Sequence, residues 1–167
     1  MLSDSMQKAL NQQLNMELYS AYYYLSAAAH FENEELLGFA SWTKHQAQEE
    51  VDHARRIYEY INDAGGRVLL EAIDKPPHEF QSALAVVEGF LEHEQKVTKS
   101  IHDLVEQANK EKDHATGVFL QWFVTEQVEE EATAGHLVRQ VKRCADSPQA
   151  LLLLDHKLGQ RQSGAHD

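Results

Sequence analysis

The chain has 167 residues, of which 43% are hydrophobic and 25% are charged, a composition typical of a globular protein with one sizeable core. We therefore expect a single domain over residues 1–167. Its 27 acidic residues outnumber the 15 basic ones, for a formal net charge of −12. This excess argues against a nucleic-acid partner and fits either a protein that attracts cations or a merely solvated acidic surface.

Four long helices are predicted from apolar residues that recur at three- and four-residue steps. They run over about residues 5–31, 35–64, 82–109 and 113–145. On the third helix the predicted buried face consists of Leu84, Val87, Leu91, Glu94, Thr98, Ile101, Val105 and Ala108. A short fifth helix over about 147–158 opens with Ser147 as its N-cap and Pro148 at the first helical position. The remainder, residues 159–167, is expected to be a flexible tail.

The connections between the helices limit the topology. Short turns join the first helix to the second and the third to the fourth, so each pair should be antiparallel. The link between the second and third helices, GGRVLLEAIDKPPHEFQ, has 17 residues. Extended, it could reach roughly 55 Å, whereas a long helix of this chain spans roughly 42 Å. We therefore predict an all-α four-helix bundle with one long crossover, followed by the short fifth helix.

Each of the four apolar faces is interrupted near the middle of its helix by polar groups. The interruptions are Glu17, Glu50 with His53, Glu94, and Gln127 with Glu130. Whatever the helix directions, groups at mid-helix should meet at one level of the bundle. A single buried polar residue is ordinarily a satisfied core group, but four at one depth are not explained in that way. Buried carboxylates cost several kcal/mol each unless they are paired, and no lysine or arginine lies on these faces at that level.

A metal centre would account for the interrupted faces. The four glutamates sum to −4, which two divalent cations would neutralise. His53 follows Glu50 at i+3, so it points the same way and adds a nitrogen ligand. Carboxylate oxygens with one imidazole and no thiolate favour iron or manganese, although zinc accepts the same ligands.

The cellular location is inferred from cysteine use and hydropathy. Cys144 is the only cysteine, which excludes an internal disulfide and fits a reducing compartment. The first residues lack the apolar core of a signal peptide, and the longest apolar run, AYYYLSAAAHF, is too short to span a bilayer. We expect a cytoplasmic protein with no membrane partner.

The central residues resemble those of the bacterial non-haem ferritins, within the ferritin-like di-iron carboxylate family, over essentially the whole chain. In the family pattern two helices each give one glutamate and two each give a Glu-x-x-His motif. Glu17 and Glu94 match the lone acids, and Glu50 with His53 matches one motif. The fourth helix departs from the pattern, with glutamine at 127 and glutamate at 130, as in ferritins proper. The resemblance implies two irons per subunit, held by unequal numbers of ligands.

Further roles follow from the same resemblance. It implies a third iron site that shares Glu130 and has three additional ligands, Glu49, Glu126 and Glu129. By position alone, these acids also fit a solvated charge run. Tyr24 is implied to lie beside the metals and to supply an electron to oxygen. By default Tyr24 and Trp122 are both core aromatics.

The fifth helix is expected to take part in assembly. Leu151 to Leu154 put apolar groups all round it, so it must be buried. The resemblance implies a homo-oligomeric hollow shell of twenty-four subunits, in which this helix packs on symmetry mates at fourfold axes. The alternative is a helix folded back on its own bundle. No haem is expected, because the methionines lie at 1, 6 and 16, and bacterioferritins bind haem through a methionine of the second helix.

The function implied by the resemblance is a ferroxidase and iron store. Ferrous ions would bind at the centre, dioxygen or peroxide would take their electrons, and ferric oxyhydroxide would collect inside the shell. One alternative is a di-iron oxygenase or peroxidase that acts on a small substrate. Another is a DNA-protecting mini-ferritin, which the acidic balance and the ligands within one bundle disfavour. A purely structural bundle would leave the central acids unexplained.

Overall fold

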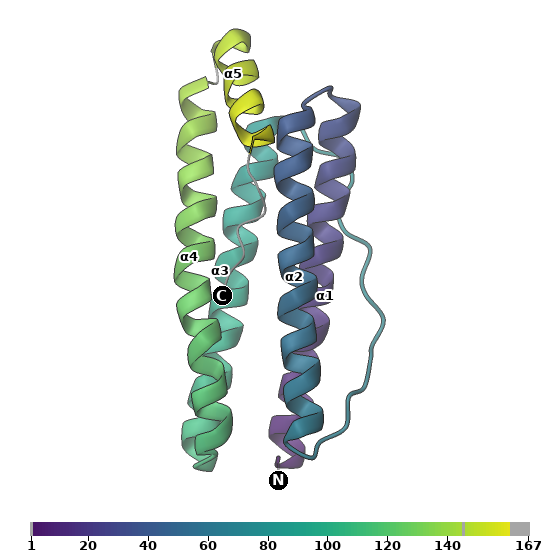
Figure 1. The fold of residues 1–167 in the computed structure, drawn as a ribbon, viewed down its shortest axis with the longest axis vertical. Coiled ribbons are helices and arrows are strands. Elements are labelled where there is room, and N and C mark those ends of the chain that lie inside the picture. Colours follow the sequence, from purple (N-terminus) through teal and green to yellow (C-terminus); the bar gives the residue numbers. More distant parts are fainter. Residues whose placement is uncertain (1, 145, 161–167) are drawn as a thin grey trace.

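The computed structural model describes residues 2–144 and 146–160, and the predicted all-α fold is confirmed (Figure 1). Within these described ranges five helices follow one another: α1 (Asp4–Asn33), α2 (Leu37–Asp63), α3 (Ala83–Glu111), α4 (His114–Cys144) and α5 (Pro148–Gly159). The predicted tail from residue 161 onward lies outside the described residues. Within those residues, no helix is long and apolar enough to cross a membrane.

The ends of the helices follow local sequence signals. α1, α3 and α5 each begin after a serine whose hydroxyl accepts a hydrogen bond from a backbone N–H of the first turn. These N-caps are Ser3, Ser82 and Ser147. After α2, Gly65 adopts a φ of 76°, in the left-handed region that favours glycine, and this turns the chain out of the helix.

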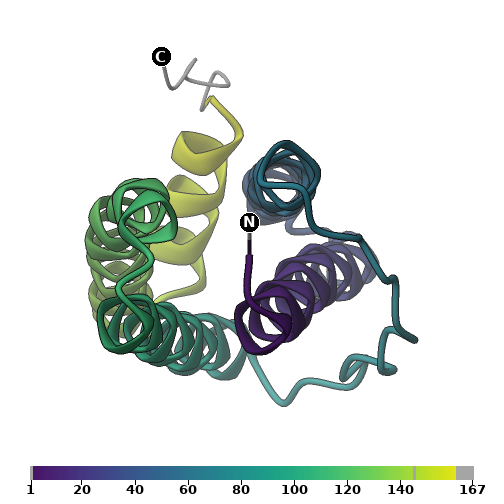
Figure 2. The ribbon, with the colours of Figure 1, turned by 90° about the horizontal axis from the view of Figure 1, so that it is seen from below.

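The bundle consists of two antiparallel pairs, α1 with α2 and α3 with α4, as Figures 1 and 2 show. Residues 64–82 run beside α1 from one end of the bundle to the other, which leaves α2 and α3 parallel. The crossover is tied to α1 by side-chain hydrogen bonds. Asn11 donates to the carbonyl of Arg67 and accepts from the N–H of Leu69, and Ser26 donates to the carbonyl of Pro77. The predicted topology is therefore confirmed.

The apolar core is divided into two clusters. One contains Phe31, Phe39, Phe90 and Leu137, and the other contains Leu10, Ile57, Ile101 and Phe123. Each fully buried side chain of this size contributes about 1.5–3 kcal/mol to the free energy of folding. The clusters belong to opposite halves of the helices, and the polar mid-helix positions lie between them.

The buried face of α3 agrees with the predicted one at half of its positions. Buried as predicted are Val87, Glu94, Ile101 and Ala108. Only half-buried are Leu84, Leu91, Thr98 and Val105. Buried in addition are Val86, Phe90, Val97 and Leu104. Apolar residues cover a wide arc of α3, so the sequence pattern allows more than one side of this helix to face the core. Contacts with α1 and α4 select the side in the fold. Glu94 belongs to the buried face in both cases.

α5 packs back on its own bundle through only one of its faces. Leu154 is buried, and the carboxylate of Asp155 accepts a hydrogen bond of 2.9 Å from the N–H of Phe39 in the first turn of α2. A β-carbon at Gly38 would lie 1.7 Å from the Asp155 carbonyl oxygen, so this contact requires glycine. Leu152 and Leu153 remain 59% and 72% exposed. The alternative of a helix folded back on its own bundle therefore holds for one face of α5, and the other face is uncovered.

Candidate metal centre

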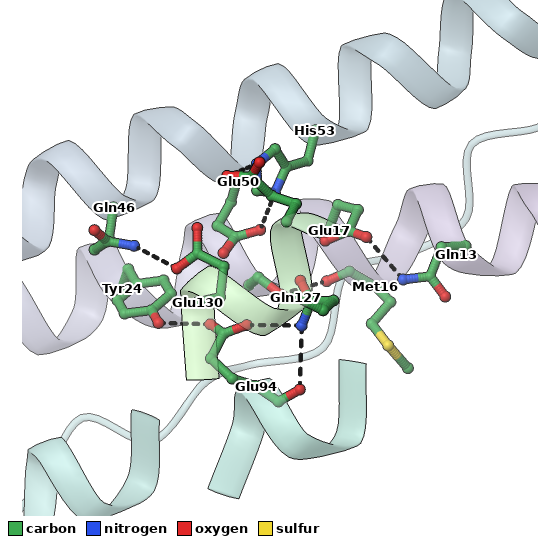
Figure 3. Close-up of polar contacts among 12 residues, drawn as sticks. Gln13, Met16, Glu17, Tyr24, Gln46, Glu50, His53, Glu94, Gln127 and Glu130 are labelled. Carbon is green, nitrogen blue, oxygen red and sulfur yellow. Dashed lines mark hydrogen bonds and ion pairs between the residues drawn. The ribbon is translucent and has the colours of Figure 1, made fainter. Parts of the chain in front are cut away.

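The polar groups that interrupt the four helices meet inside the bundle (Figure 3). The residues brought together are Glu17, Glu50, His53, Glu94, Gln127 and Glu130, and all are buried. They come from the middles of four helices. The short turns and the long crossover place these mid-helix positions at the same level of the bundle. The spacing in the sequence therefore produces one polar layer between two apolar clusters.

Hydrogen bonds connect α3 to α1 and to α4 within this layer. The hydroxyl of Tyr24 donates to Glu94 Oε1 over 2.6 Å, so the predicted position of Tyr24 beside the central acids is observed. The amide nitrogen of Gln127 lies 3.3 Å from Glu94 Oε2 and 3.2 Å from the hydroxyl of Thr98. Because an amide N–H can only donate, Gln127 faces the carboxylate of Glu94 with its nitrogen end.

The remaining glutamates also have amide partners. Gln46 Nε2 donates to Glu130 Oε2 over 3.0 Å, and Gln13 Nε2 donates to Glu17 Oε1 over 2.7 Å. The second carboxylate oxygen of Glu17 is buried and has no hydrogen-bond partner. An unpartnered buried oxygen is costly, which indicates a position for a ligand.

His53 lies between two groups of potential ligands. Its Nδ1 is 3.1 Å from Glu50 Oε2, and its Nε2 is 3.9 Å from Glu126 Oε1. Ligand atoms of Glu17, Glu50 and His53 lie within 4.8 Å of one another, as do those of His53, Glu126 and Glu130. Trp122 packs edge-on against the His53 ring at 5.4 Å between centroids. His53 therefore borders two groups of carboxylates, one with Glu17 and Glu50 and the other with Glu126 and Glu130.

Burial dominates the electrostatics of the cluster. It raises the pKa of Glu50 well above the ordinary value, and the neighbouring carboxylates of Glu94 and Glu17 raise it further. Burial likewise raises the pKa of Glu130 well above its ordinary value, with Glu94 as the next cause. For Glu17, burial raises the pKa while the His53 charge opposes the shift. Within the described residues, no lysine or arginine forms an ion pair with these acids.

The three acids predicted for an accessory site are placed differently from one another. Glu126 is buried and Glu49 is half-buried. The carboxylates of both raise the pKa of Glu130, after the larger effects of burial and of Glu94, so both lie near it. Glu129 is exposed. The structure thus brings Glu49 and Glu126 to Glu130, and leaves Glu129 on the surface.

The donor set suits an oxygen-preferring divalent cation. Four buried carboxylates and one imidazole converge with no thiolate, which is the combination that favours iron or manganese. The unpartnered Oε2 of Glu17 gives such an ion a ready ligand. The residues present therefore fit iron.

Sequence comparison places this geometry among known proteins. A family model described as the ferritin-like domain matches residues 7–144, which is most of the chain. The chain belongs to the ferritin family.

Relatives of this ferritin match it over nearly its whole length. A bacterial non-heme ferritin of Bacteroides fragilis is 44% identical over 161 residues, which cover 96% of this chain and 100% of the relative. One from Staphylococcus aureus is 40% identical and covers 96% and 97% of the two chains. The solved open pore ferritin of the archaeon Archaeoglobus fulgidus is 49% identical, with a TM-score of 0.96 and coverage of 97% and 100%. The predicted resemblance to bacterial non-haem ferritins is confirmed.

Without metal, the stability of this ferritin should decrease as the pH rises through the pKa values of its central glutamates. Burial raises the pKa values of Glu17, Glu50, Glu94 and Glu130 above 4.5. The protonated carboxyl groups therefore contribute fully to the free energy of unfolding when the pH is below their ordinary pKa. This contribution is lost as the pH rises above their raised pKa values. Each unit of difference between the folded and unfolded pKa amounts to about 1.4 kcal/mol.

Unfolding of the metal-free protein at about pH 6 and about pH 8 measures this dependence. Glu50→Gln should make the free energy of unfolding less dependent on pH. Glu106→Gln, at an exposed position of α3, should leave it unchanged. Equal pH dependence in the parent and in Glu50→Gln would contradict the electrostatic account.

Proposed function

We propose that this ferritin stores iron within a multimeric shell and oxidises ferrous iron at the central carboxylate cluster. The observation that carries the proposal is the group of four buried glutamates that, among the residues described, form no ion pair with a lysine or arginine. The bacterial non-heme ferritin names of its relatives support iron storage. A reducing cytoplasm fits the single cysteine, Cys144.

In this proposal two ferrous ions are the substrate of the cluster. Glu17, Glu50 and His53 hold one ion, and Glu94, Gln127 and Glu130 contribute to the other. Each ion gives one electron, so two adjacent ions can reduce one dioxygen molecule by two electrons in a single encounter. The protein supplies the geometry and the negative charge, and the metals supply the redox chemistry.

Tyr24 can deliver a further electron to the same site. Its hydroxyl donates to Glu94 over 2.6 Å. When the phenol loses an electron, its proton can pass to Glu94 Oε1 along that hydrogen bond. Burial, followed by the charge of Glu94, raises the pKa of Tyr24 well above its ordinary value. The phenol is thus kept protonated until it is oxidised.

The accessory acids are proposed to form a third iron site beside Glu130. Glu49 and Glu126 lie near Glu130, and Glu129 extends the site from its exposed position. The partly exposed arrangement suits a site that holds iron or passes it between the centre and the surface.

Two uncovered apolar surfaces support a shell made of copies of this chain. One is the outer face of α5 with Leu152 and Leu153. The other is a groove of about 350 Å³ lined by α1, α2 and the crossover, which includes Val51, Tyr58 and Leu70. The expected assembly is a hollow homo-oligomer of twenty-four subunits. Such surfaces are normally covered in a stable protein.

Anaerobic titration with ferrous iron tests the metal assignment. The parent should bind two ions per subunit tightly and a third more weakly. Glu50→Ala and His53→Ala should each lose tight binding by at least about tenfold, because each removes a ligand. The control His102→Ala, at an exposed position of α3, should titrate like the parent. Parent-like curves for both site variants would refute the assignment.

A further inference from the structure

Gln13 lies beside the metal centre although it is not one of the expected ligands. It is 1% exposed and precedes Glu17 by one helical turn on α1. Its Nε2 donates to Glu17 Oε1 over 2.7 Å, as Figure 3 shows. Its Oε1 accepts a hydrogen bond of 2.5 Å from the hydroxyl of Ser100 on α3. Both ends of the amide are therefore used.

The Glu17 carboxylate determines which end of the amide faces the metal centre. An ionised carboxylate can only accept, so it requires the amide nitrogen, whereas the Ser100 hydroxyl can donate or accept and here donates to the remaining amide oxygen. In the flipped orientation the oxygens of Gln13 and Glu17 would face each other. The hydrogen bond from α3 thus anchors the other end of the amide while its nitrogen donates to the carboxylate.

This arrangement gives the two oxygens of Glu17 different roles. Oε1 is held by Gln13, whereas Oε2 is buried without a hydrogen-bond partner. With one oxygen fixed, the carboxylate cannot rotate freely, and the other oxygen is presented to the cluster. Hydrogen bonds of this kind orient metal ligands and strengthen metal binding.

A comparable contact exists on the other side of the centre. Gln46 on α2 donates to Glu130 Oε2 over 3.0 Å. Two carboxylates of the cluster are therefore each held by a buried amide from a helix. At Gln13, the hydroxyl of Ser100 on α3 also donates to the other end of the amide.

We propose that Gln13 is a positioning residue which orients Glu17 for metal binding, and that Ser100 anchors the Gln13 amide. This inference rests on the proposed metal site. It assigns a function to the contact between α1 and α3. The hydrogen bond from Gln13 supports a proposed ligand, although Gln13 is not itself one of the central residues.

The test uses Co²⁺ as the probe with the full chain, because its visible absorption reports ligand geometry without redox turnover. Gln13→Leu, which removes the donor, should weaken tight Co²⁺ binding roughly 10- to 100-fold and alter the absorption band. Gln13→Glu keeps an acceptor for Ser100 and loses the donor, so it should also weaken binding. Ser100→Ala should cause a smaller loss, and Ser100→Thr, which keeps the hydroxyl, should match the parent.

The controls separate positioning from packing. Gln12→Leu, the exposed neighbour on α1, should bind Co²⁺ like the parent. If Gln13→Leu lowers only the unfolding temperature of the metal-free protein, with parent affinity and spectrum, the positioning role is refuted. If the parent itself binds no Co²⁺ at the centre, the proposed metal site fails and the inference falls with it. Should Gln13→Leu not fold, Ser100→Ala with parent affinity and spectrum refutes the orienting role of the hydrogen-bonded pair.

Discussion

Replacing Glu94 or Glu130 with alanine is expected to abolish the fast oxidation of ferrous iron. Loss of a hydrogen-bonding partner to a ligand alone typically costs 10- to 100-fold, so loss of a ligand should lower the rate by at least about 100-fold. Glu94 also carries the contacts to Tyr24 and Gln127. Glu130 lies near Glu94, whose charge raises the pKa of Glu130 after the larger effect of burial. Removing either acid should prevent two ferrous ions from binding next to each other.

The accessory acids provide the matched comparison. Glu49→Ala and Glu126→Ala should keep the fast phase, because they lie beside Glu130 and not between the two proposed ions. Both variants should change the ratio of iron oxidised to oxygen consumed and slow repeated turnover. Stopped-flow absorbance after mixing ferrous protein with oxygen measures the fast phase. A Glu126→Ala variant as slow as Glu94→Ala would remove the distinction between the oxidising pair and the third site.

Assembly should fail when the apolar groove between α1, α2 and the crossover is given negative charges. Tyr58 and Leu70 are 45% and 68% exposed in the single subunit. In the double variant Tyr58→Glu with Leu70→Glu, each contact between copies would bury unpaired carboxylates at a cost of several kcal/mol. Because this contact recurs throughout a shell, we expect small oligomers or single subunits in place of the large particle.

Sedimentation velocity and iron retained per particle measure this effect. The small species should still bind ferrous iron at the centre, because the ligands belong to one bundle, but should retain no mineral. Lys96→Glu, an exposed charge reversal on α3, should assemble like the parent. A full-sized, iron-filled particle from the double variant would show that this groove is not a contact between subunits.

Most of the fold could be predicted because its determinants are local or follow from length. Pro148 and the serine caps mark helix starts, and the 17-residue link is long enough to cross the bundle. The buried face of α3 could be predicted only in part, at Val87, Ile101 and Ala108. Val86 and Phe90 are buried and Leu84 and Leu91 half-buried, because contacts with other helices select one face of a broadly apolar helix.

The ligands at the centre could be identified because a charged residue on an apolar face is conspicuous in the sequence. The groups that hold them are less visible. Gln13 precedes Glu17 by four residues, so the spacing in the sequence predicts that the two side chains are neighbours on α1. Ser100, on a different helix, became recognisable only when the helices were packed. Exposure of Glu129 likewise depends on how α4 is turned against its neighbours.

The contact between α5 and α2 ties the last helix to the start of the second. Asp155 accepts from the N–H of Phe39, 116 positions earlier, and the approach needs the bare backbone at Gly38. α5 therefore fits only where α2 begins at this residue. A substitution that shifts the start of α2 would also displace Leu152 and Leu153, the uncovered side chains of α5.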